Sequence, residues 1–227
     1  MNQKKIEIIC TLGPRSLNKE FLKFSKNKIS LLRLNMSHLS LGRLKKAIQF
    51  VKKNTNIPIC IDTEGAQIRI KVKNEKFLRF GQNITISNIG NNISLYPENV
   101  FKQIKVNDIL NVGSNNLFLK VLKKKNDILC KVLSAGKLEG NKGVHLENRK
   151  IKLNYLTKKD FEAIKIGKRF KIKNYALSFT NSISDIIKFN DLLKGENKIF
   201  KIETLRATKN FKSILKKGHL FLIDRGD

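Results

Sequence analysis

Short apolar runs alternate with amphipathic stretches along the first part of the chain. The apolar, β-branched runs at Ile6–Leu12, Ile29–Leu34 and Ile57–Ile61 predict buried strands. Between them, hydrophobic residues recur at helical spacing over Leu17–Asn27 and Ser40–Lys53. Strands and helices that alternate with short connections predict parallel pairing, in an α/β barrel or a doubly wound sheet.

This alternation stops between about Ile70 and Arg149, where no helical pattern is evident. Short alternating runs separated by Asn- and Gly-rich turns predict a small all-β unit inserted into the α/β chain. We therefore expect residues 1–69 and 150–227 to form one domain and residues 70–149 to form a second. The strands expected in the insert are Gln82–Ile89, Asp108–Val112, Leu117–Val121 and Ile128–Val132.

Helix–strand alternation resumes at Thr157, which resembles the first residue of a capping box completed by Asp160. Together with the first three strands, the pattern gives six parallel strands outside the insert. The later helices are expected at Lys158–Ile166, which ends near Gly167, Ile183–Leu193 and Arg206–Lys217, and the later strands at Tyr175–Phe179, Lys198–Ile202 and Leu220–Ile223.

Charge changes this picture little. The sequence has 47 Lys and Arg against 18 Asp and Glu, a formal net charge of +29. This excess invites a nucleic-acid-binding hypothesis, which stays open as an alternative. However, the lysines are scattered, with no run longer than Lys123–Lys125, and Lys, Asn and Ile are the residues that an AT-rich genome overproduces. We interpret the charge as compositional bias on solvated faces and expect no nucleic-acid partner.

The three cysteines, Cys10, Cys60 and Cys130, lie far apart inside apolar runs. They lack metal-ligand spacing and are typical of a reducing compartment. No apolar run is long enough to cross a membrane, and the N-terminal MNQKKIEIIC lacks the apolar core of a signal peptide. We expect a cytoplasmic protein without a membrane partner.

Candidate chemistry is concentrated around Asn197–Thr204, a predicted strand in which Lys201 and Glu203 share one face. Because isolated buried charges are costly, we expect both side chains to protrude where the strand ends. There the ammonium could steady a transferring anionic group while the carboxylate holds a metal. A structural ion pair at the strand end is the alternative interpretation.

The other strands also deliver polar residues at their carboxyl ends, where parallel α/β folds place reactive groups. Glu203 and Asp227 follow adjacent strands and suit Mg²⁺. The planar guanidinium groups of Arg33 and Arg69 suit phosphate, and Gly226 allows a ligand to approach the backbone closely. A mostly neutral oxygen set suited to a monovalent cation comprises Asn35, Ser37, Asp62 and Thr63.

A metal, arginines and one lysine around a shared anion are typical of phosphoryl transfer. Each residue also has a structural alternative: Arg33 could pair with Asp62, Ser37 could cap the following helix, and His38 could simply pack.

The motifs ICTLGPRS, LLRLNMSH, IDTEGAQIR, KGVHLEN, YALSF, KIE and RGD occur in the order found in pyruvate kinases. The resemblance covers nearly the whole chain, and the inserted β unit falls where that family carries its mobile lid. It implies an incomplete (β/α)8 TIM-type barrel of six strands with an inserted small β-barrel domain. It also implies phosphoryl transfer from phosphoenolpyruvate to ADP with Mg²⁺ and K⁺, and we expect the full-length protein to be a homotetramer.

The resemblance also implies residue roles. Lys201 would be catalytic, stabilising the phosphoryl group in flight and helping to protonate the enolate. Glu203 and Asp227 would bind Mg²⁺, and Asn35, Ser37, Asp62 and Thr63 would bind K⁺. Phosphoenolpyruvate would contact Arg33, Lys201, Gly226 and Asp227; ADP or ATP would contact Asn35, Met36, Ser37, His38, Arg69 and Lys142.

The chain departs from the family pattern in several places. It stops at Asp227, before the last two strands of such a barrel. Glu64 stands where the family has lysine, and Asn181 stands where a basic residue is usual. A fragment or a decayed gene would explain the length. A degenerate relative that binds phosphoenolpyruvate, or acts as a scaffold without catalysis, is the alternative function.

Overall fold

The computed structural model describes residues 6–88, 92–113 and 117–223, which form two compact units. Residues 6–66 and 155–223 make the first unit, and the described residues between 67 and 154 make the second. Gly226 and Asp227 lie outside the described residues, as does the start of the chain up to residue 5. None of the helices in the described ranges is long and apolar enough to span a bilayer.

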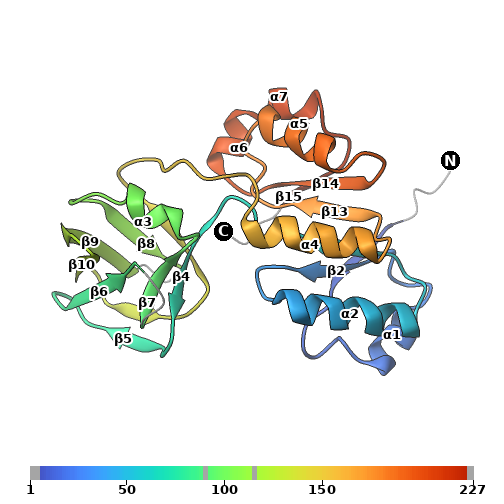
Figure 1. The fold of residues 1–227 in the computed structure, drawn as a ribbon, viewed down its shortest axis with the longest axis horizontal. Coiled ribbons are helices and arrows are strands. Elements are labelled where there is room, and N and C mark those ends of the chain that lie inside the picture. The colour runs from blue at the N-terminus through green and yellow to red at the C-terminus, as the bar shows by residue number, and fades with distance from the viewer. Residues whose placement is uncertain (1–5, 89–91, 114–116, 224–227) are drawn as a thin grey trace. The chain divides into compact units, whose positions relative to one another are not determined.

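The first unit is built on one 6-stranded parallel sheet (Figure 1). Its neighbouring strands all pair in parallel, as the alternation of strands and helices predicts. The strand order is β1-β2-β3-β13-β14-β15, where the strands are β1 (Ile9–Thr11), β2 (Leu31–Asn35), β3 (Ile59–Asp62), β13 (Asn174–Leu177), β14 (Asn197–Ile202) and β15 (Phe221–Ile223).

Helices connect these strands, and polar caps begin several of them. The Ser40 side chain accepts a hydrogen bond from the amide of Arg43, and Thr157 and Asp160 form the predicted capping box. The helices of this unit are α1 (Lys19–Ser25), α2 (Leu41–Asn54), α4 (Lys158–Arg169), α5 (Ile183–Leu192), α6 (Leu205–Lys209) and α7 (Phe211–Leu215).

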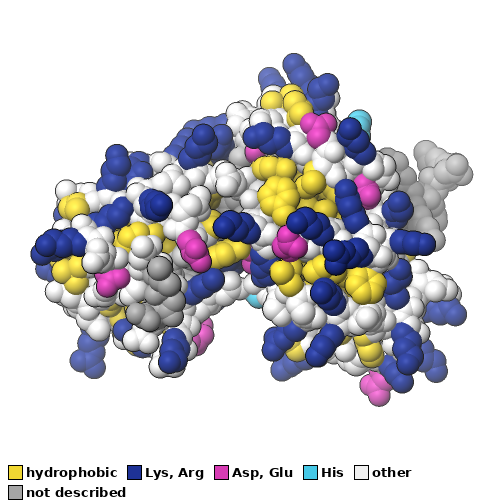
Figure 2. Space-filling view, in the orientation of Figure 1, with side chains coloured by type: hydrophobic (Ala, Val, Ile, Leu, Met, Phe, Trp, Pro, Cys, Tyr) yellow, Lys and Arg dark blue, Asp and Glu magenta, His cyan; other side chains and the backbone are white. Residues whose placement is uncertain are grey.

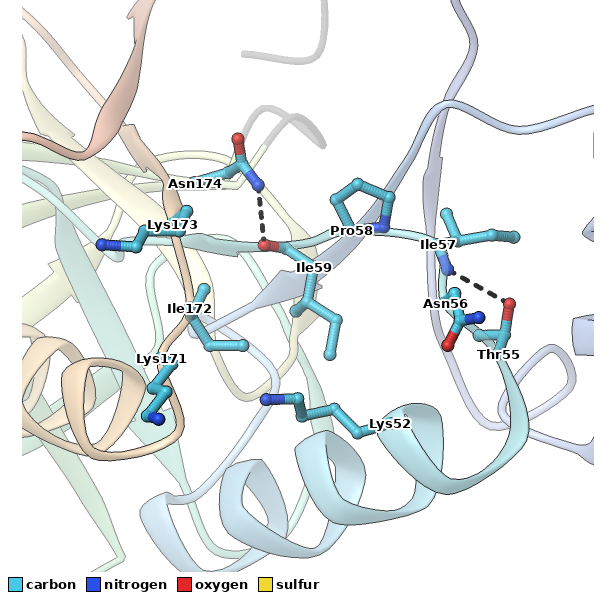
Figure 3. A pocket seen from close by; sticks show the side chains of 10 residues that line it. All are labelled: Lys52, Thr55, Asn56, Ile57, Pro58, Ile59, Lys171, Ile172, Lys173 and Asn174. Atoms are coloured by element: carbon cyan, nitrogen blue, oxygen red, sulfur yellow. Dashed lines mark hydrogen bonds between the residues drawn. The ribbon is translucent and has the colours of Figure 1, made fainter.

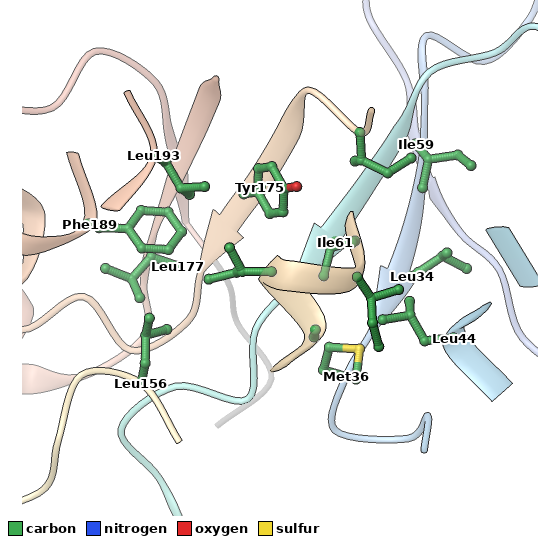
Figure 4. Close-up of a cluster of buried hydrophobic side chains, with 14 of the residues drawn as sticks. Leu34, Met36, Leu44, Ile59, Ile61, Leu156, Tyr175, Leu177, Phe189 and Leu193 are labelled. Atoms are coloured by element: carbon green, nitrogen blue, oxygen red, sulfur yellow. The ribbon is translucent and has the colours of Figure 1, made fainter. Parts of the chain in front are cut away.

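The two faces of the sheet differ in chemistry. Alternate strand residues such as Leu34, Ile61 and Leu177 meet the helices in a large apolar core that also holds Leu44 and Phe189 (Figure 4). The other face carries a small apolar cluster of Cys60, Ala176 and Ile199, with Leu31 and Leu222 packed against it. Strand periodicity places the polar and charged residues of the carboxyl ends on this same face.

The second unit is a closed antiparallel-rich barrel with its own core, as predicted for the insert. A separate two-stranded ladder, β5 (Lys76–Leu78) with β11 (Gly136–Leu138), accompanies it. The barrel order is β10-β6-β7-β4-β12-β8-β9, where the strands are β4 (Ile68–Val72), β6 (Asn83–Ser87), β7 (Ile93–Tyr96), β8 (Ile109–Val112), β9 (Leu117–Lys124), β10 (Asp127–Val132) and β12 (Lys142–Leu146). The fold is therefore an incomplete TIM-type barrel with an inserted all-β barrel.

Three predictions about helices are wrong. The insert contains a short helix, α3 (Asn99–Gln103), which buries Val100 and Phe101. Helix α4 does not end near Gly167 but continues to Arg169, because Gly167 lies where the helix packs closely against the sheet. The predicted helix Arg206–Lys217 is divided into α6 and α7 at Asn210, whose side-chain amide donates to the carbonyl of Asn181.

Several strands are shorter than predicted, and β1 and β13 show this most informatively. Strand β1 begins at Ile9 rather than Ile6. Strand β13 ends at Leu177 rather than Phe179, and Phe179 has a left-handed backbone conformation with φ 53°. A strand cannot continue through that conformation, so the chain turns sharply at the carboxyl end of β13.

Candidate active site

Charged side chains from three strands of the first unit converge at the carboxyl end of the sheet. Strand β2 supplies Arg33, β3 ends with Asp62, and β14 supplies Lys201 followed by Glu203. The ammonium of Lys201 lies 2.9 Å from Glu203 Oε1 and 3.4 Å from Asp62 Oδ2. The same Asp62 oxygen lies 3.5 Å from Arg33 Nε. Two cations thus face two carboxylates, which makes the cluster formally neutral.

The prediction that Lys201 protrudes from the strand end is wrong. Its residue is only 4 % exposed, and Asp62 is fully buried. The cost of burying a lone charge does not apply here, because each charge has an opposite charge within contact distance. The ion pairs named above as structural alternatives are therefore both formed: Lys201 pairs with Glu203, and Arg33 pairs with Asp62.

The environment changes the acidity of these groups in opposing ways. Burial raises the pKa of Asp62 and that of Glu203, and the nearby Lys201 ammonium counteracts both shifts. Burial alone would lower the pKa of Lys201, but Asp62 and Glu203 reverse this and hold it above its ordinary value. Lys201 is therefore a cation at neutral pH, able to face a further anion.

Ser178, just past β13, fills the space between Asp62 and Lys201, and the sequence reasoning did not include it among the site residues. Its hydroxyl donates to Asp62 Oδ1 at 3.0 Å and accepts from Lys201 Nζ at 3.4 Å. Its amide donates to Thr63 Oγ1 at 3.1 Å. Its place at a strand end, inside a motif of the resemblance, is the signal that could have identified it.

The carboxylate of Glu203 is held by the sharp turn that follows β13. The amide of Phe179 donates to Glu203 Oε2 at 2.7 Å, and Phe179 is the residue with φ 53°. A left-handed conformation costs free energy for a bulky residue. Here it aims an amide at the carboxylate, which fixes one of the two predicted Mg²⁺ ligands; the other, Asp227, lies outside the described residues.

The four predicted K⁺ ligands lie at the carboxyl ends of β2 and β3: Asn35 and Asp62 end the strands, and Ser37 and Thr63 lie in the loops that follow. Asn35 is the register partner of Asp62, so these two side chains start side by side. Asn35 Oδ1 accepts from the amide of Ser37 at 2.9 Å, and Thr63 is buried directly after Asp62. One carboxylate with neutral oxygens around it is a donor set that suits a monovalent cation. Ser37 does not cap the following helix, because Ser40 does.

The remaining residues of the RLNMSH motif have mixed positions. The Met36 side chain is fully buried in the apolar core (Figure 4), so it offers no polar group to the site. The amide of Met36 donates to the carbonyl of Asp62 at 2.9 Å, and the amide of His38 donates to the carbonyl of Asn35 at 3.2 Å. His38 itself is exposed.

Gly65 allows the loop after β3 to contact the loop after β13. It has φ +69°, and a Cβ built on it would lie 2.3 Å from the carbonyl oxygen of Ser178. Both the backbone conformation and the space therefore require glycine. This close approach fixes Asp62 and Thr63 relative to Ser178.

Two predicted nucleotide contacts, Arg69 and Lys142, lie on adjacent strands of the second unit. Arg69 is in β4, and its Nη1 donates to the carbonyl of Asn141 at 2.9 Å. Lys142 begins β12, and its ammonium lies 3.4 Å from Glu139 Oε2. The register pairs Arg69 with Gly143 and Lys142 with Ile70, so the two side chains start on opposite faces of the ladder.

Many lysines have structural contacts. Figure 2 shows Lys and Arg side chains dispersed over the face in view, with Asp and Glu between them. Several ammonium groups bind main-chain carbonyls near helix ends, where the helix dipole favours cations. Lys52 donates to Phe170 at 2.7 Å, and Lys168 donates to Leu192 at 2.8 Å. These contacts fit the interpretation of the charge as dispersed rather than as one binding surface.

A cavity of about 330 Å³ lies at the opposite, amino ends of β3 and β13 (Figure 3). Ile59 and Asn174 line it, together with Lys52 and the Lys171–Lys173 loop. The carboxyl ends of α2 and α4 point toward it, and helix carboxyl ends disfavour anions. The cavity holds none of the charged cluster, so we place the candidate active site at the carboxyl rim.

Comparisons with known proteins agree on one family. A family model described as "Pyruvate kinase, barrel domain" matches residues 3–227. The pyruvate kinase of Staphylococcus saprophyticus is 30% identical over 99% of this chain and 42% of its own length. That of Methanocaldococcus jannaschii is 31% identical over 99% of this chain and 50% of its own length. A crystal structure of Cryptosporidium parvum pyruvate kinase matches with a TM-score of 0.88 and 26% identity, covering 99% of this chain and 52% of that one. The chain spans about half the length of these relatives.

Proposed function

The chain belongs to the pyruvate kinase family, and from that premise we propose that the protein of which it forms part transfers the phosphoryl group of phosphoenolpyruvate to ADP, giving pyruvate and ATP. The observation that carries the proposal is the convergence of Lys201, Glu203, Asp62 and Arg33 at the carboxyl ends of parallel strands. This is where α/β folds bind and convert their substrates.

Lys201 is the proposed catalytic residue. Phosphoryl transfer depends on positioning and on neutralising negative charge, and a buried ammonium does both at low solvent exposure. In the proposed reaction the bond between the phosphorus and the enol oxygen breaks, and a bond forms from phosphorus to the terminal oxygen of ADP. The enolate then takes a proton at its methylene carbon, and the Lys201 ammonium helps that protonation.

Substrate binding is assigned to the residues around this amine. Arg33, Gly226 and Asp227 would contact phosphoenolpyruvate, and a guanidinium suits a phosphate or a carboxylate. Asn35 to His38, together with Arg69 and Lys142 of the inserted barrel, would contact the nucleotide. We expect the complete protein to be cytoplasmic and to form a homotetramer. Light scattering of the purified protein would test the oligomeric state.

Two ions complete the proposal, and the described donors fit them. Glu203 offers a carboxylate of the kind that Mg²⁺ prefers, together with Asp227. Asn35, Ser37, Asp62 and Thr63 offer one charge and neutral oxygens, which fits K⁺. When bound, the divalent ion would supply positive charge next to the transferring phosphoryl oxygens. The residues themselves orient the ligand atoms: Phe179 holds Glu203, and Ser178 holds Asp62 and Thr63.

The test is a coupled assay of pyruvate formation by the complete gene product with Mg²⁺ and K⁺. Lys201→Met should lower turnover by about a hundredfold to a thousandfold, because it removes one preorganised charge that stabilises the transition state. Lys194→Met, which removes an exposed lysine from the loop before β14, is the matched control and should keep turnover. Undiminished turnover in Lys201→Met would refute the role of Lys201.

One observation favours the degenerate relative as a second candidate. Glu64 stands where the family has lysine, and it is buried beside the proposed K⁺ ligands rather than turned to solvent. Calorimetry with phosphoenolpyruvate distinguishes the two functions. Binding without turnover in the complete protein would support the degenerate relative, and normal turnover would eliminate it.

A further inference from the structure

We propose that Lys159, in the first turn of α4, is a positioning residue that holds together the two loops carrying the K⁺ ligands. The inference rests on the proposed function, and it concerns a residue that contacts none of the reacting groups. Lys159 belongs to neither loop. It reaches both from a third element of the first unit.

The ammonium of Lys159 makes two short contacts. It donates to the carbonyl of Met36 at 2.6 Å, in the loop after β2, between Asn35 and Ser37. It also donates to Glu64 Oε1 at 2.7 Å, in the loop after β3, directly after Asp62 and Thr63. One amine thus connects the two segments that carry all four proposed ligands.

The partner carboxylate has a fixed orientation. Glu64 is 5 % exposed, and its second oxygen, Oε2, accepts from the hydroxyl of Thr157 at 3.1 Å. The side chain of Lys159 is 25% exposed and that of Glu64 7%. An ion pair shielded to this extent is held more firmly than one on an open surface, because water and salt screen it less.

The main chain of the same loop is fixed by the neighbouring residue. Asp160 Oδ1 accepts from the amide of Glu64 at 2.7 Å, and Oδ2 accepts from the amide of Gly65 at 3.1 Å. Asp160 also accepts from the amide of Thr157 in the capping box, at 2.9 Å. The first turn of α4 therefore holds the loop after β3 in two ways. Asp160 binds the main-chain amides of the loop, and Lys159 binds the side chain of Glu64.

The division of roles follows from these contacts. Asp160 fixes one loop and caps the helix, so its loss would disturb the fold in general. Lys159 is the link between the two loops, so its loss would let Asn35 and Ser37 shift relative to Asp62 and Thr63. Cation affinity depends on the spacing of ligand oxygens, and outer partners of ligands typically change affinity by about ten- to a hundredfold.

The experiment uses the complete protein and titrates KCl at constant ionic strength against tetramethylammonium chloride. Two readouts are followed: the rise in melting temperature without substrate, and the K⁺ activation of pyruvate formation. Lys159→Met should raise the half-maximal K⁺ concentration by at least about tenfold in both readouts. Lys158→Met, which removes an exposed lysine from the same helical turn, is the matched control and should leave it within about twofold.

A K⁺ midpoint that stays unchanged in Lys159→Met would overturn the inference, even if the melting temperature fell, since a purely structural role predicts that result. If Lys159→Met does not fold, Glu64→Gln decides in its place, because it removes the ion pair and keeps an oxygen for Thr157. An unchanged midpoint in Glu64→Gln would then count against the proposal.

The outcomes separate this inference from the proposed function. A wild-type protein without turnover, but with K⁺ stabilisation that depends on Lys159, would refute the kinase proposal and support the positioning role. A wild-type protein that forms pyruvate without any response to K⁺ would support the kinase proposal and refute the positioning role.

Discussion

The ammonium of Lys201 lies 3.4 Å from the carboxylate of Asp62, although 139 positions separate the two residues in the chain. They belong to β14 and β3, which are not neighbours, because β13 lies between them. The contact is possible because Ala176 of β13 has a small side chain on this face and Ser178 offers a hydroxyl to both groups. The sheet thus joins a cation and an anion across an intervening strand.

The first prediction concerns stability and its dependence on pH. Lys201→Met leaves the buried Asp62 carboxylate with Arg33 as its cation and removes the Glu203 ion pair, so we expect the free energy of unfolding at pH 8 to fall by about 3 kcal/mol or more. Burial raises the pKa of both carboxyls, and Lys201 opposes that shift, so the substitution raises both pKa values further.

The sign of the pH effect follows from proton binding. With raised pKa values, the folded variant binds more protons than the unfolded chain, so its stability recovers as the pH falls through those values. Urea denaturation at pH 8 and pH 5 should show a smaller difference from wild type at pH 5. A difference that is the same at both pH values would contradict this account, and Lys194→Met is again the control.

The second prediction compares two glycines in helices. A Cβ on Gly167 would lie 2.6 Å from Ile61 Cδ1 and 2.6 Å from Tyr175 Oη, both in the packed core. We expect Gly167→Ala to lower the free energy of unfolding by about 1 to 2 kcal/mol, because overpacking outweighs the helix propensity gained.

Gly42→Ala is the matched substitution in α2. Among the described residues, a Cβ there meets no atom within 4 Å. Alanine restricts the unfolded chain and favours the helix, so we expect a gain of about 0.5 kcal/mol. Denaturation curves of the two variants should move in opposite directions from wild type, and a shift in the same direction would show that packing does not decide the effect.

The third prediction concerns thiol reactivity. Cys60 and Cys130 are buried, and burial raises the pKa of Cys60 and brings that of Cys130 to about 12. Thiolate is the reactive form, so iodoacetamide at pH 8 should modify the half-buried Cys10 well before either of them. Peptide mass spectrometry measures the order. In guanidinium chloride all three should react, and fast native labelling of Cys130 would mean that the inserted barrel opens readily.

Much of the fold was predictable because it depends on local patterns. Strand periodicity placed Lys201 and Glu203 on one face, and the alternation of strands with helices predicted the parallel sheet. The capping box at Thr157 followed from residue types and spacing alone. The fold class, and the family that the sequence motifs indicated, were confirmed.

The errors arise where distant contacts decide local structure. Lys201 was expected to protrude because a lone buried charge is costly, yet Arg33, Asp62 and Glu203 make it one member of a neutral cluster. Asn210 divides a continuous helical pattern because its side chain bonds to the carbonyl of Asn181. Lys159 gave no signal in the sequence, since its partners are far away in the chain. The roles of the site residues stay predictions.

The last prediction concerns a bidentate ion pair in the inserted barrel. Arg149 Nε donates to Asp108 Oδ1 at 2.7 Å, and Arg149 Nη2 donates to Asp108 Oδ2 at 2.6 Å. The same nitrogen also donates to the carbonyl of Gln103, at the end of α3. This guanidinium therefore ties the segment after β12 to the start of β8 and to α3.

We expect Arg149→Met to leave the buried Asp108 carboxylate with the amide of Lys105 as a remaining donor. The cost to the inserted barrel should be about 2 to 3 kcal/mol, less than for a fully buried pair, because the Arg149 side chain is 29% exposed. Arg149→Lys should recover part of this, since an ammonium keeps the charge but lacks the planar fork.

Hydrogen exchange followed by mass spectrometry measures the effect where it should occur. The amides of α3, β8 and β12 should exchange faster in Arg149→Met than in wild type. Lys150→Met, which removes an exposed neighbouring lysine, should leave those rates unchanged. Faster exchange in the first unit, with protection kept in these three elements, would mean that Arg149 acts outside the barrel. The geometry of its two carboxylate bonds predicts the reverse, because both partners that it joins belong to the inserted unit.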